Sequence, residues 1–296
     1  MPRYPVLRPG LRAVRRGDGR VQVGLDPPER TVLPDDASTT ILLGWLAAGR
    51  RGDGHEDADR LLADRVLADL VARGLVLDAD DARRVVGAAA AASRHRPGAL
   101  AGLCRDPRGG DERAARRGGL VVATTVPAGL AQELARRCGD SGVCTRGAGP
   151  PAASLLVTTG EPVRGVVDAL ARDDLPHLLV ALHPDRVRIG PFVVPGQTAC
   201  LRCLDAHAAD RDPHRGAVLV RLEAEPVHEP LPAPYDPALA SLALAWAVRD
   251  LASFLEGDEP ATWSATVRVG TDLSVVRRRW LRHPGCGCAW GDALTG

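Results

Sequence analysis

Ser154-Leu-Leu-Val-Thr-Thr159 and His177-Leu-Leu-Val-Ala-Leu182 are short apolar runs of the kind that form strands buried on both faces. Between them, Val163 to Arg172 has the spacing of a helix. The same order occurs upstream, where Leu120 to Thr125 indicates a strand and Ala128 to Cys138 a helix. Alternating strands and helices predict an α/β domain with a Rossmann-like, doubly wound parallel sheet.

Further segments extend this domain towards the end of the chain. Gly142 to Thr145 is expected to start another strand, and Ala238 to Leu255 is expected to form a helix. Trp263 to Arg268 and Leu273 to Trp280 indicate two late strands. These segments belong to the same α/β unit as the central runs.

A different pattern precedes residue 95. Leu11 to Arg16 and Arg20 to Leu25 flank a glycine-rich turn, which indicates a hairpin. Arg30 to Leu33 is a third extended piece, whereas Thr40 to Ala48 and Asp57 to Arg73 have helical character, and a glycine follows each of these two helices. Short strands combined with two helices predict a small winged-helix-like module.

The chain length of 296 residues favours two domains. We expect the winged-helix-like module over residues 1–95, an Arg/Gly/Pro-rich linker over 96–119, and the α/β domain over 120–296.

Four cysteines occur in two tight pairs, Cys200 with Cys203 and Cys286 with Cys288. Each pair has the spacing of two thiolate ligands at a tetrahedral zinc site. A disulfide is the weaker alternative, because two cysteines separated by one residue can bridge only with strain. Four thiolates leave no open coordination position, so the zinc would be structural rather than catalytic.

Composition excludes several classes of function. The formal net charge is +1, so no bulk field attracts nucleic acid or an anionic membrane. No apolar signal segment or membrane-spanning run is recognisable, which predicts a cytoplasmic protein. All 38 basic residues are arginine, which excludes Schiff-base chemistry and a phosphate-binding lysine.

The first strand-to-helix turn lacks the features of a nucleotide site. A dinucleotide-binding turn needs glycines so that backbone amides can approach a pyrophosphate. Here the turn reads Thr124-Thr-Val-Pro-Ala-Gly-Leu-Ala131, in which Val126 and Pro127 obstruct that approach. We therefore expect no bound ATP.

Two stretches resemble a known family: Gly190 to Pro213, which includes the first cysteine pair, and His283-Pro-Gly-Cys-Gly-Cys288. They are similar to the ThiF/E1-like (Ocin-ThiF-like) leader-peptide-binding proteins of thiazole/oxazole-modified peptide (TOMM) biosynthesis, a branch of RiPP and bacteriocin biosynthesis. These proteins are also described as cyclodehydratase partners. The resemblance covers most of the chain and implies an N-terminal peptide-recognition module followed by a degenerate E1-like domain with structural zinc.

The resemblance also implies partners and a mode of action. The module would bind the leader of a ribosomal precursor peptide, and a separate ATP-using YcaO enzyme would perform the cyclodehydration. The chain itself would be a pseudoenzyme, and a homodimer through the E1-like domain is a further expectation. Zinc would be held by Cys200, Cys203, Cys286 and Cys288.

A leader can bind such a module by adding a strand to an exposed sheet edge beside a helix. The alternative is a solvated edge without a ligand. The expected groove combines an edge strand and one helix face: Arg30, Thr31, Val32 and Leu33 on the strand, and Arg65, Asp69 and Arg73 on the helix.

Two other functions stay open. An E1-like adenylyltransferase would activate a carboxylate with ATP, although the obstructed turn and the missing lysine oppose it. A zinc-stabilised winged-helix transcription factor is the third hypothesis, but the helical region over 56–73 holds more carboxylates than arginines and would repel phosphate. His207 to Asp212 could supply an acid/base pair, but we interpret this run as helix polarity and capping.

Overall fold

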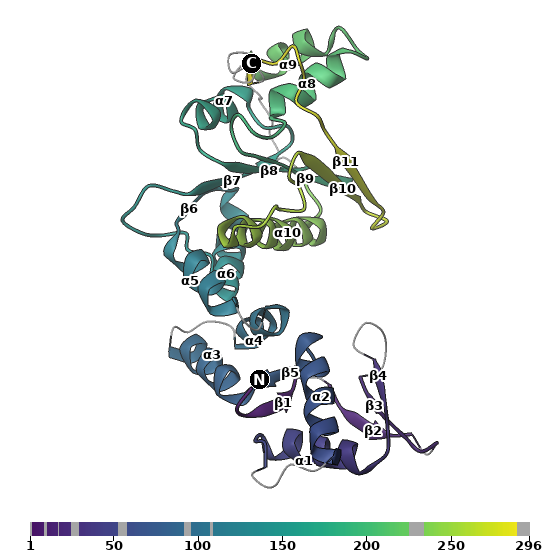
Figure 1. Ribbon diagram of the computed structural model, residues 1–296. Helices are drawn as coiled ribbons and strands as arrows, with labels where there is room; N and C mark the ends of the chain where they lie inside the picture. The colour runs from purple at the N-terminus through teal and green to yellow at the C-terminus, as the bar shows by residue number, and fades with distance from the viewer. Residues whose placement is uncertain are drawn as a thin grey trace, which may run out of the picture. The chain divides into compact units, whose positions relative to one another are not determined.

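The structure is a computed structural model that describes residues 2–8, 11–16, 18–24, 30–52, 58–91, 96–106, 109–224 and 234–288. The chain divides into two compact units, Met1–Glu112 and Arg113–Gly296. Each unit is described by itself (Figure 1).

Unit 1 contains two small antiparallel sheets. The first has the order β2 (Ala13–Arg15), β3 (Arg20–Val23), β4 (Thr31–Pro34), so β4 is an edge strand. The second pairs β1 (Pro5–Leu7) with β5 (Val76–Asp78). The hairpin and the third extended piece predicted from the sequence are therefore present, although Gly17 of the expected turn lies outside the described residues.

The helices of unit 1 follow local signals. α1 (Ala37–Ala48) begins where the Asp36 side chain accepts a hydrogen bond from the Thr39 amide, and it ends at Gly49 in the left-handed conformation. α2 spans Ala58–Ala72 and α3 spans Ala79–Ala91. The start of the helix expected at Asp57 lies outside the described residues.

One apolar core joins β4 to both helices. Leu33 of β4 packs with Leu42 of α1 and with Leu67 and Leu70 of α2. Burying a leucine side chain contributes on the order of 1.5–3 kcal/mol, so this shared cluster fixes the strand beside the helices.

The predicted linker over 96–119 is helical instead. α4 spans Arg96–Arg105 and α5 spans Gly110–Gly119, and the boundary between the two units falls within α5. This segment is rich in glycine, but the alanine, leucine and arginine residues between the glycines favour helix. The composition that predicts a linker therefore did not indicate these two helices.

The sheet of unit 2 has six strands in the order β11-β10-β9-β8-β7-β6. Three strands are parallel, namely β6 (Val122–Thr125), β7 (Ala153–Thr159) and β8 (His177–Leu182). The other three join antiparallel, namely β9 (Arg186–Val193), β10 (Ala265–Gly270) and β11 (Val275–Arg279).

This mixed sheet differs from the doubly wound parallel sheet that the sequence predicts. Only three residues separate β8 from β9, whereas a parallel connection needs a crossover of a dozen or more residues. The strand expected from Gly142 to Thr145 is reduced to one bridge between Val121 and Cys144. The α/β class was correct, but β9 was not predicted as a strand, and β9 and β11 run opposite to the other four strands.

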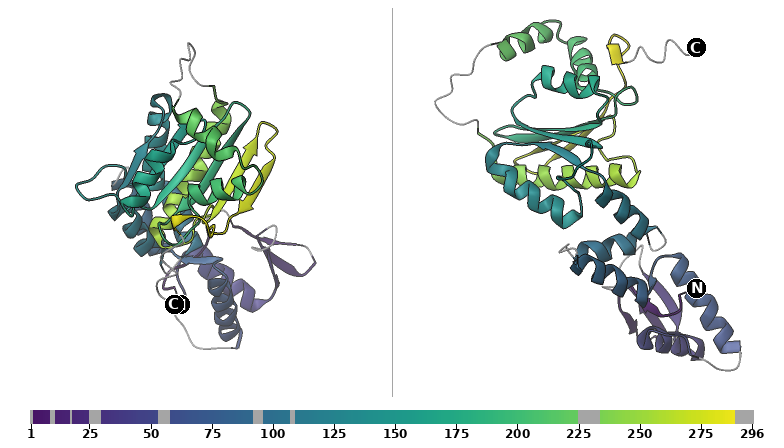
Figure 2. Two further views of the ribbon diagram at one scale, coloured as in Figure 1. Left: turned by 90° about the horizontal axis from the view of Figure 1, so that it is seen from above. Right: turned by 90° about the vertical axis from the view of Figure 1, so that its left-hand side faces the viewer.

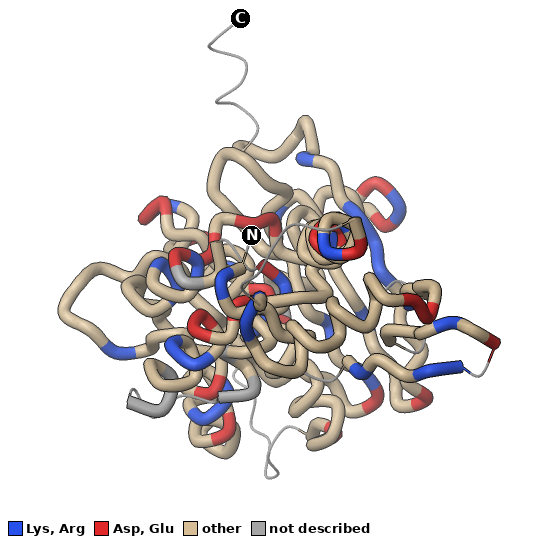
Figure 3. Tube along the Cα trace, turned by 60° about the horizontal axis from the view of Figure 1, so that its bottom comes forward, with Lys and Arg blue, Asp and Glu red and all other residues tan. Residues whose placement is uncertain are grey.

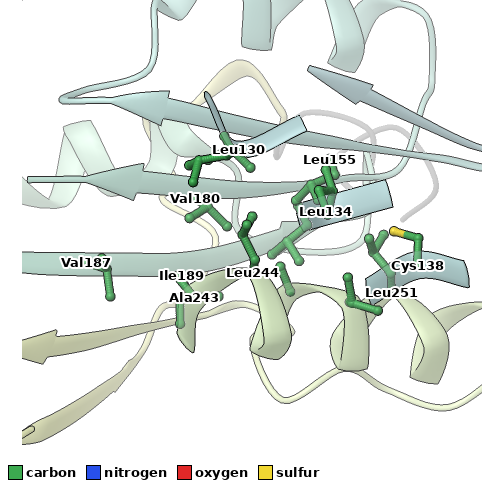
Figure 4. Packing of buried hydrophobic residues seen from close by; sticks show 14 of the residues in the cluster. Leu130, Leu134, Cys138, Leu155, Val180, Val187, Ile189, Ala243, Leu244 and Leu251 are labelled. Carbon is green, nitrogen blue, oxygen red and sulfur yellow. The ribbon is translucent and has the colours of Figure 1, made fainter. Parts of the chain in front are cut away.

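Helices cover both faces of this sheet (Figures 1 and 2). On one face, α6 (Ala131–Ser141) and α10 (Pro237–Glu256) pack Leu134 and Leu244 against the strands (Figure 4). The smaller cluster on the other face includes Val167 of α7 (Arg164–Arg172) and Leu201 of α8 (Leu201–Ala209). α9 (Arg215–Ala224) follows α8.

Among the described helices, α10 alone is long and apolar enough to cross a membrane by length and composition. Its leucine and alanine side chains lie in the main core, where Ala243, Leu244 and Leu251 are fully buried. This burial is the property of a core helix.

Candidate metal centre

The two cysteine pairs meet at one point. Cys200 is the N-cap residue of α8, Cys203 lies in the first turn of that helix, and Cys286 and Cys288 lie in the turn that follows β11. The four sulfur atoms all lie within 4.8 Å of one another. The structure therefore brings together all four residues that the sequence predicts as metal ligands.

The sulfur separations match a thiolate tetrahedron. Sγ of Cys200 lies 3.7 Å from Cys203, 3.7 Å from Cys286 and 3.6 Å from Cys288, and the Cys203–Cys288 separation is 3.2 Å. Zinc–sulfur bonds of about 2.3 Å in tetrahedral geometry place sulfurs about 3.8 Å apart. None of the described cysteines forms a disulfide. The donor set therefore fits a divalent metal such as zinc.

Without a cation, the buried cluster resists full ionisation. A hydrogen bond from the Cys200 thiol lowers the pKa of Cys203 to about 4, so one thiolate is favoured. Donating that bond and burial raise the pKa of Cys200, and burial together with the bond to Cys203 raises the pKa of Cys288 to about 12. A bound cation would compensate the charge of the remaining thiolates, because metal binding releases their protons.

A second group beside the centre joins α8 to the C-terminal segment. His207 Nε2 lies 3.0 Å from the Leu281 carbonyl oxygen, and His283 Nε2 lies 3.1 Å from Asp210. The Gly285 amide donates to His283 Nδ1 at 3.0 Å, so both ring nitrogens of His283 have partners. His207, Asp210 and His283 could surround a metal by distance, but their hydrogen bonds make them a clasp for the cysteine turn. The sequence interpretation of His207 to Asp212 as structural polarity agrees with this geometry.

A cavity of about 720 Å³ borders the metal centre. Its walls come from α7, α8, α9 and the turn Gly285 to Cys288, and Arg202 forms an ion pair with Asp168 at its edge, with atoms 2.6 Å apart. Holding the turn against α8 therefore also shapes the cavity.

An arginine–carboxylate network lies where β7 and β8 end, and the sequence analysis missed it. Arg188 donates to both oxygens of Glu161 at 2.7 and 3.0 Å. Arg164, almost fully buried, donates to both oxygens of Asp205 in α8 at 2.8 and 3.0 Å. Bidentate pairs of this type carry strong geometric specificity. The available sequence signal was that polar residues follow the predicted strands. The partners of each pair are distant in sequence, so this signal does not predict the pairing.

This network determines the ionisation of Glu161. Burial opposes its charge, but the hydrogen bond and charge of Arg188 and the charge of Arg164 outweigh burial and lower the pKa of Glu161 to about 2. Both arginines are thereby neutralised by carboxylates rather than left open to an anion.

The first strand-to-helix turn differs from a glycine-rich phosphate-binding turn. Pro127 has no amide hydrogen, and the Leu130 amide already donates to the Pro127 carbonyl at 2.8 Å. Val126 packs on the main core, and a side chain at Gly129 would contact the Tyr235 hydroxyl at 3.6 Å. The residues that the sequence predicts as an obstruction, Val126 and Pro127, are thus followed by a short 3-10 turn in which the Leu130 amide is already bonded.

The expected peptide edge is an open strand edge in unit 1. The Asp35 amide donates to the Gly19 carbonyl of the neighbouring strand. Because ladder bonds alternate along an antiparallel strand, Leu33 and Thr31 face β3 with their backbone, whereas Val32 and Arg30 direct theirs away from it. No described strand pairs with this side of β4.

The expected helix residues form an exposed stripe on α2 and the residue after it. Arg65, Asp69 and Arg73 follow at intervals of four, and all three are exposed. Arg73 pairs with Asp69 at 3.5 Å. At 100° per residue, Arg65 points away from the buried Leu67 and Leu70, while Arg73 lies on the flank of the helix. Whether a peptide contacts these residues stays a prediction.

We compared the chain with known proteins. No protein-family model matches it, and no curated protein matches it. The solved heterocyclase TruD matches with a TM-score of 0.68 and 16% identity, over 97% of this chain and 43% of that chain. A heterocyclase in complex with substrate and cofactor matches with a TM-score of 0.65 and 14% identity, over 98% of this chain and 40% of that chain.

MccB of E. coli is similar along its full length. The structure with succinimide has a TM-score of 0.61 and 13% identity, and the match covers 97% of this chain and 99% of that chain. The chain shares its fold with these proteins. It spans less than half of the heterocyclase chains, whereas MccB, which has been solved with ATP and with MccA, is matched almost completely.

We predict that metal removal destabilises unit 2. Metal analysis of the purified chain should return about one metal ion, expected to be zinc, because four thiolates complete one tetrahedron. Cys286→Ser should lower both the metal content and the midpoint of thermal unfolding. Cys144→Ser, outside the cluster, is the matched control. A Cys286→Ser chain that melts like the wild type would contradict the metal assignment.

A second prediction concerns acid stability. Glu161 has a folded-state pKa of about 2 against an ordinary value of 4.5, so its contribution is complete above about pH 4.5 and is lost as the pH falls towards 2. Arg188→Leu should remove this component and move acid unfolding to higher pH. Arg186→Leu, whose partner is the adjacent Asp185, should leave the profile unchanged. Denaturant unfolding between pH 2 and 7 measures both.

Proposed function

We propose that the chain is a non-catalytic leader-peptide-binding protein of RiPP (TOMM) biosynthesis. It would capture a ribosomal precursor and present it to a separate YcaO-type cyclodehydratase. The observation that carries this proposal is the match of 97% of the chain to only 43% of a heterocyclase. The proposal assigns the remaining part of such an enzyme to a separate partner protein.

Unit 1 supports capture of an extended peptide. The outward backbone groups of Arg30 and Val32 are available to a further strand, and main-chain hydrogen bonds along an edge supply affinity in strand addition. Leu33 ties β4 to the same core as α2, so a peptide on this edge would lie against a fixed strand. Asp69 and Arg73 would contribute polar selectivity from the helix.

We assign a structural role to the expected zinc. Four cysteine ligands would complete its coordination, and the site would hold the C-terminal turn on α8. A cytoplasmic location and a homodimer through the E1-like unit are further parts of the proposal.

The alternative is an adenylyltransferase, and MccB has been solved with ATP. The turn at Pro127 opposes this reading, because Pro127 has no amide hydrogen and the Leu130 amide already donates to the Pro127 carbonyl. The arginines near the strand ends are also paired with Glu161 and Asp205. A DNA-binding regulator is less supported, since α2 holds three aspartates against two arginines.

ATP binding separates the scaffold from the adenylyltransferase. Calorimetry with ATP and Mg²⁺ should give no saturable heat, and pyrophosphate exchange should stay at background with any precursor. E. coli MccB is a suitable positive control because it has been solved with ATP. Saturable binding would favour the adenylyltransferase over the scaffold.

We predict that Val32→Pro weakens leader binding by about tenfold, because proline removes one outward amide from the edge. Fluorescence anisotropy with the labelled leader of the precursor encoded nearby measures the effect. Ala13→Pro is the matched control. Its amide faces outward at the opposite edge of the same sheet, since the residues on either side of the strand donate to or accept from β3.

The expected result is loss of binding in Val32→Pro alone, with an unchanged metal content in both variants. Equal binding of the leader by the wild type and by Val32→Pro would exclude β4 as the strand edge that binds the peptide. If the wild-type chain does not bind the leader but shifts the mobility of duplex DNA, the DNA-binding regulator would replace the leader-binding scaffold as the proposed function.

A further inference from the structure

The last strand of the large sheet is an uncovered edge. β11 lies at the end of the six-stranded sheet, and all five of its residues are exposed. Val275 and Val276 are 56% and 50% exposed, and the flanking Leu273 and Leu281 are 63% and 81% exposed. Among the described residues, no strand or helix covers this edge. Sheet edges of this kind are templates for a further strand.

The backbone of β11 is prepared for such pairing. The Gly270 amide donates to the Ser274 carbonyl, and the Trp280 amide donates to the Ser264 carbonyl. Even-numbered positions therefore face β10, so Val275, Arg277 and Arg279 direct their amide and carbonyl groups away from the sheet. Three consecutive outward positions match the ladder of one added strand.

The charge of this edge is strongly one-sided. Arg277, Arg278 and Arg279 are consecutive, and Arg268 lies across from Val276 on β10. The Arg277 guanidinium donates to the Ala261 carbonyl, and that of Arg278 stacks on Trp280, with 3.8 Å to the ring centroid. In the described part of the chain, none of the four forms an ion pair with a carboxylate.

Other arginines of the same sheet are compensated. Arg186 pairs with Asp185 and Arg188 with Glu161. Basic and acidic positions are interspersed over much of the trace in Figure 3. The β11 edge therefore combines uncompensated positive charge with unpaired backbone groups.

We propose that β11 is a docking edge for an acidic, extended segment of a protein partner. The segment would pair with the outward groups of Val275, Arg277 and Arg279, place carboxylates beside the arginines and cover Val275 and Val276. Strand addition supplies main-chain hydrogen bonds, and charge complementarity sets the partner.

Two other occupants fit less well. In a two-fold antiparallel pairing of β11 with a second copy, the Arg277 residues would face each other or lie close together, and like charges across strands are destabilising. A nucleic acid would neutralise the arginines but would leave the outward backbone groups and the exposed valines without partners. The proposal concerns unit 2 only and does not depend on leader binding by unit 1.

The test uses the full chain and a labelled ten-residue peptide of alternating glutamate and valine. A peptide with proline at every valine position keeps the charge but loses half of its amides and has restricted backbone angles, which opposes a ladder, and a ten-nucleotide single-stranded RNA tests a general polyanion. The glutamate–valine peptide should bind saturably and about tenfold more tightly than either control.

Two variants separate backbone from charge. Arg277→Pro removes an outward amide. The double variant Arg268→Ser with Arg279→Ser removes two positive charges that form no ion pair in the described part of the chain. Each of these variants should weaken peptide binding about tenfold. Arg136→Ser with Arg146→Ser removes the same charge from exposed positions elsewhere in unit 2 and should have little effect. Unchanged metal content and circular dichroism establish that each variant is folded.

Several results would overturn the proposal. Equal binding of the glutamate–valine and proline peptides would reduce the edge to general electrostatics, and tighter binding of RNA would make it a nucleic-acid surface. Absence of peptide binding, or a wild-type dimer that Arg277→Pro converts to a monomer, would exclude an acidic strand as the occupant. A leader that still binds to Arg277→Pro separates this site from the β4 edge.

Discussion

The arrangement of the C-terminal third depends on the burial of four cysteine thiols in one cluster. Cys200 and Cys203 begin α8, and Cys286 and Cys288 end the described chain, so the cluster closes a loop of more than eighty residues. Four thiolates cannot share a buried site without a cation, because each charge opposes the next. The metal expected here would therefore be a folding element, as it is in small structural zinc sites.

The same cluster has consequences for its surroundings. The histidine clasp of His207 and His283 holds the turn that carries the second cysteine pair. That turn forms one wall of the neighbouring cavity. It also anchors the chain that leaves β11, the strand with the uncovered basic edge. The burial of the four thiols thus affects three features: the histidine clasp, the wall of the cavity and the chain that leaves β11.

The polar groups of unit 2 are largely used within the protein. Where β7 and β8 end, arginines are bonded to Glu161 and Asp205, and in the turn before α6 the Leu130 amide donates to the Pro127 carbonyl. In contrast, the edge strands β4 and β11 have backbone groups that pair with no described strand. Within the described residues, the strand ends of unit 2 are therefore rich in internal polar contacts, whereas these two edges have backbone groups open to a further strand.

The sequence by itself determined the α/β class of unit 2, the hairpin of unit 1, the approximate positions of several helices and the four cysteines that converge. These features rest on local signals: apolar spacing, capping residues such as Asp36, and ligand spacing of two or three residues. The sequence did not determine that β9 is an antiparallel strand, that α4 and α5 form within residues 96–119, or that Glu161 pairs with Arg188.

Only the tertiary structure decided these features, because each depends on what packs against a segment rather than on its own residues. A short turn after β8 reverses the sheet, and residues 27 positions apart form the Glu161–Arg188 pair. The open edges of β4 and β11 were likewise fixed by their place in the sheets. Strand propensity is read along the chain, whereas an edge is defined by the absence of a neighbouring strand among the described residues.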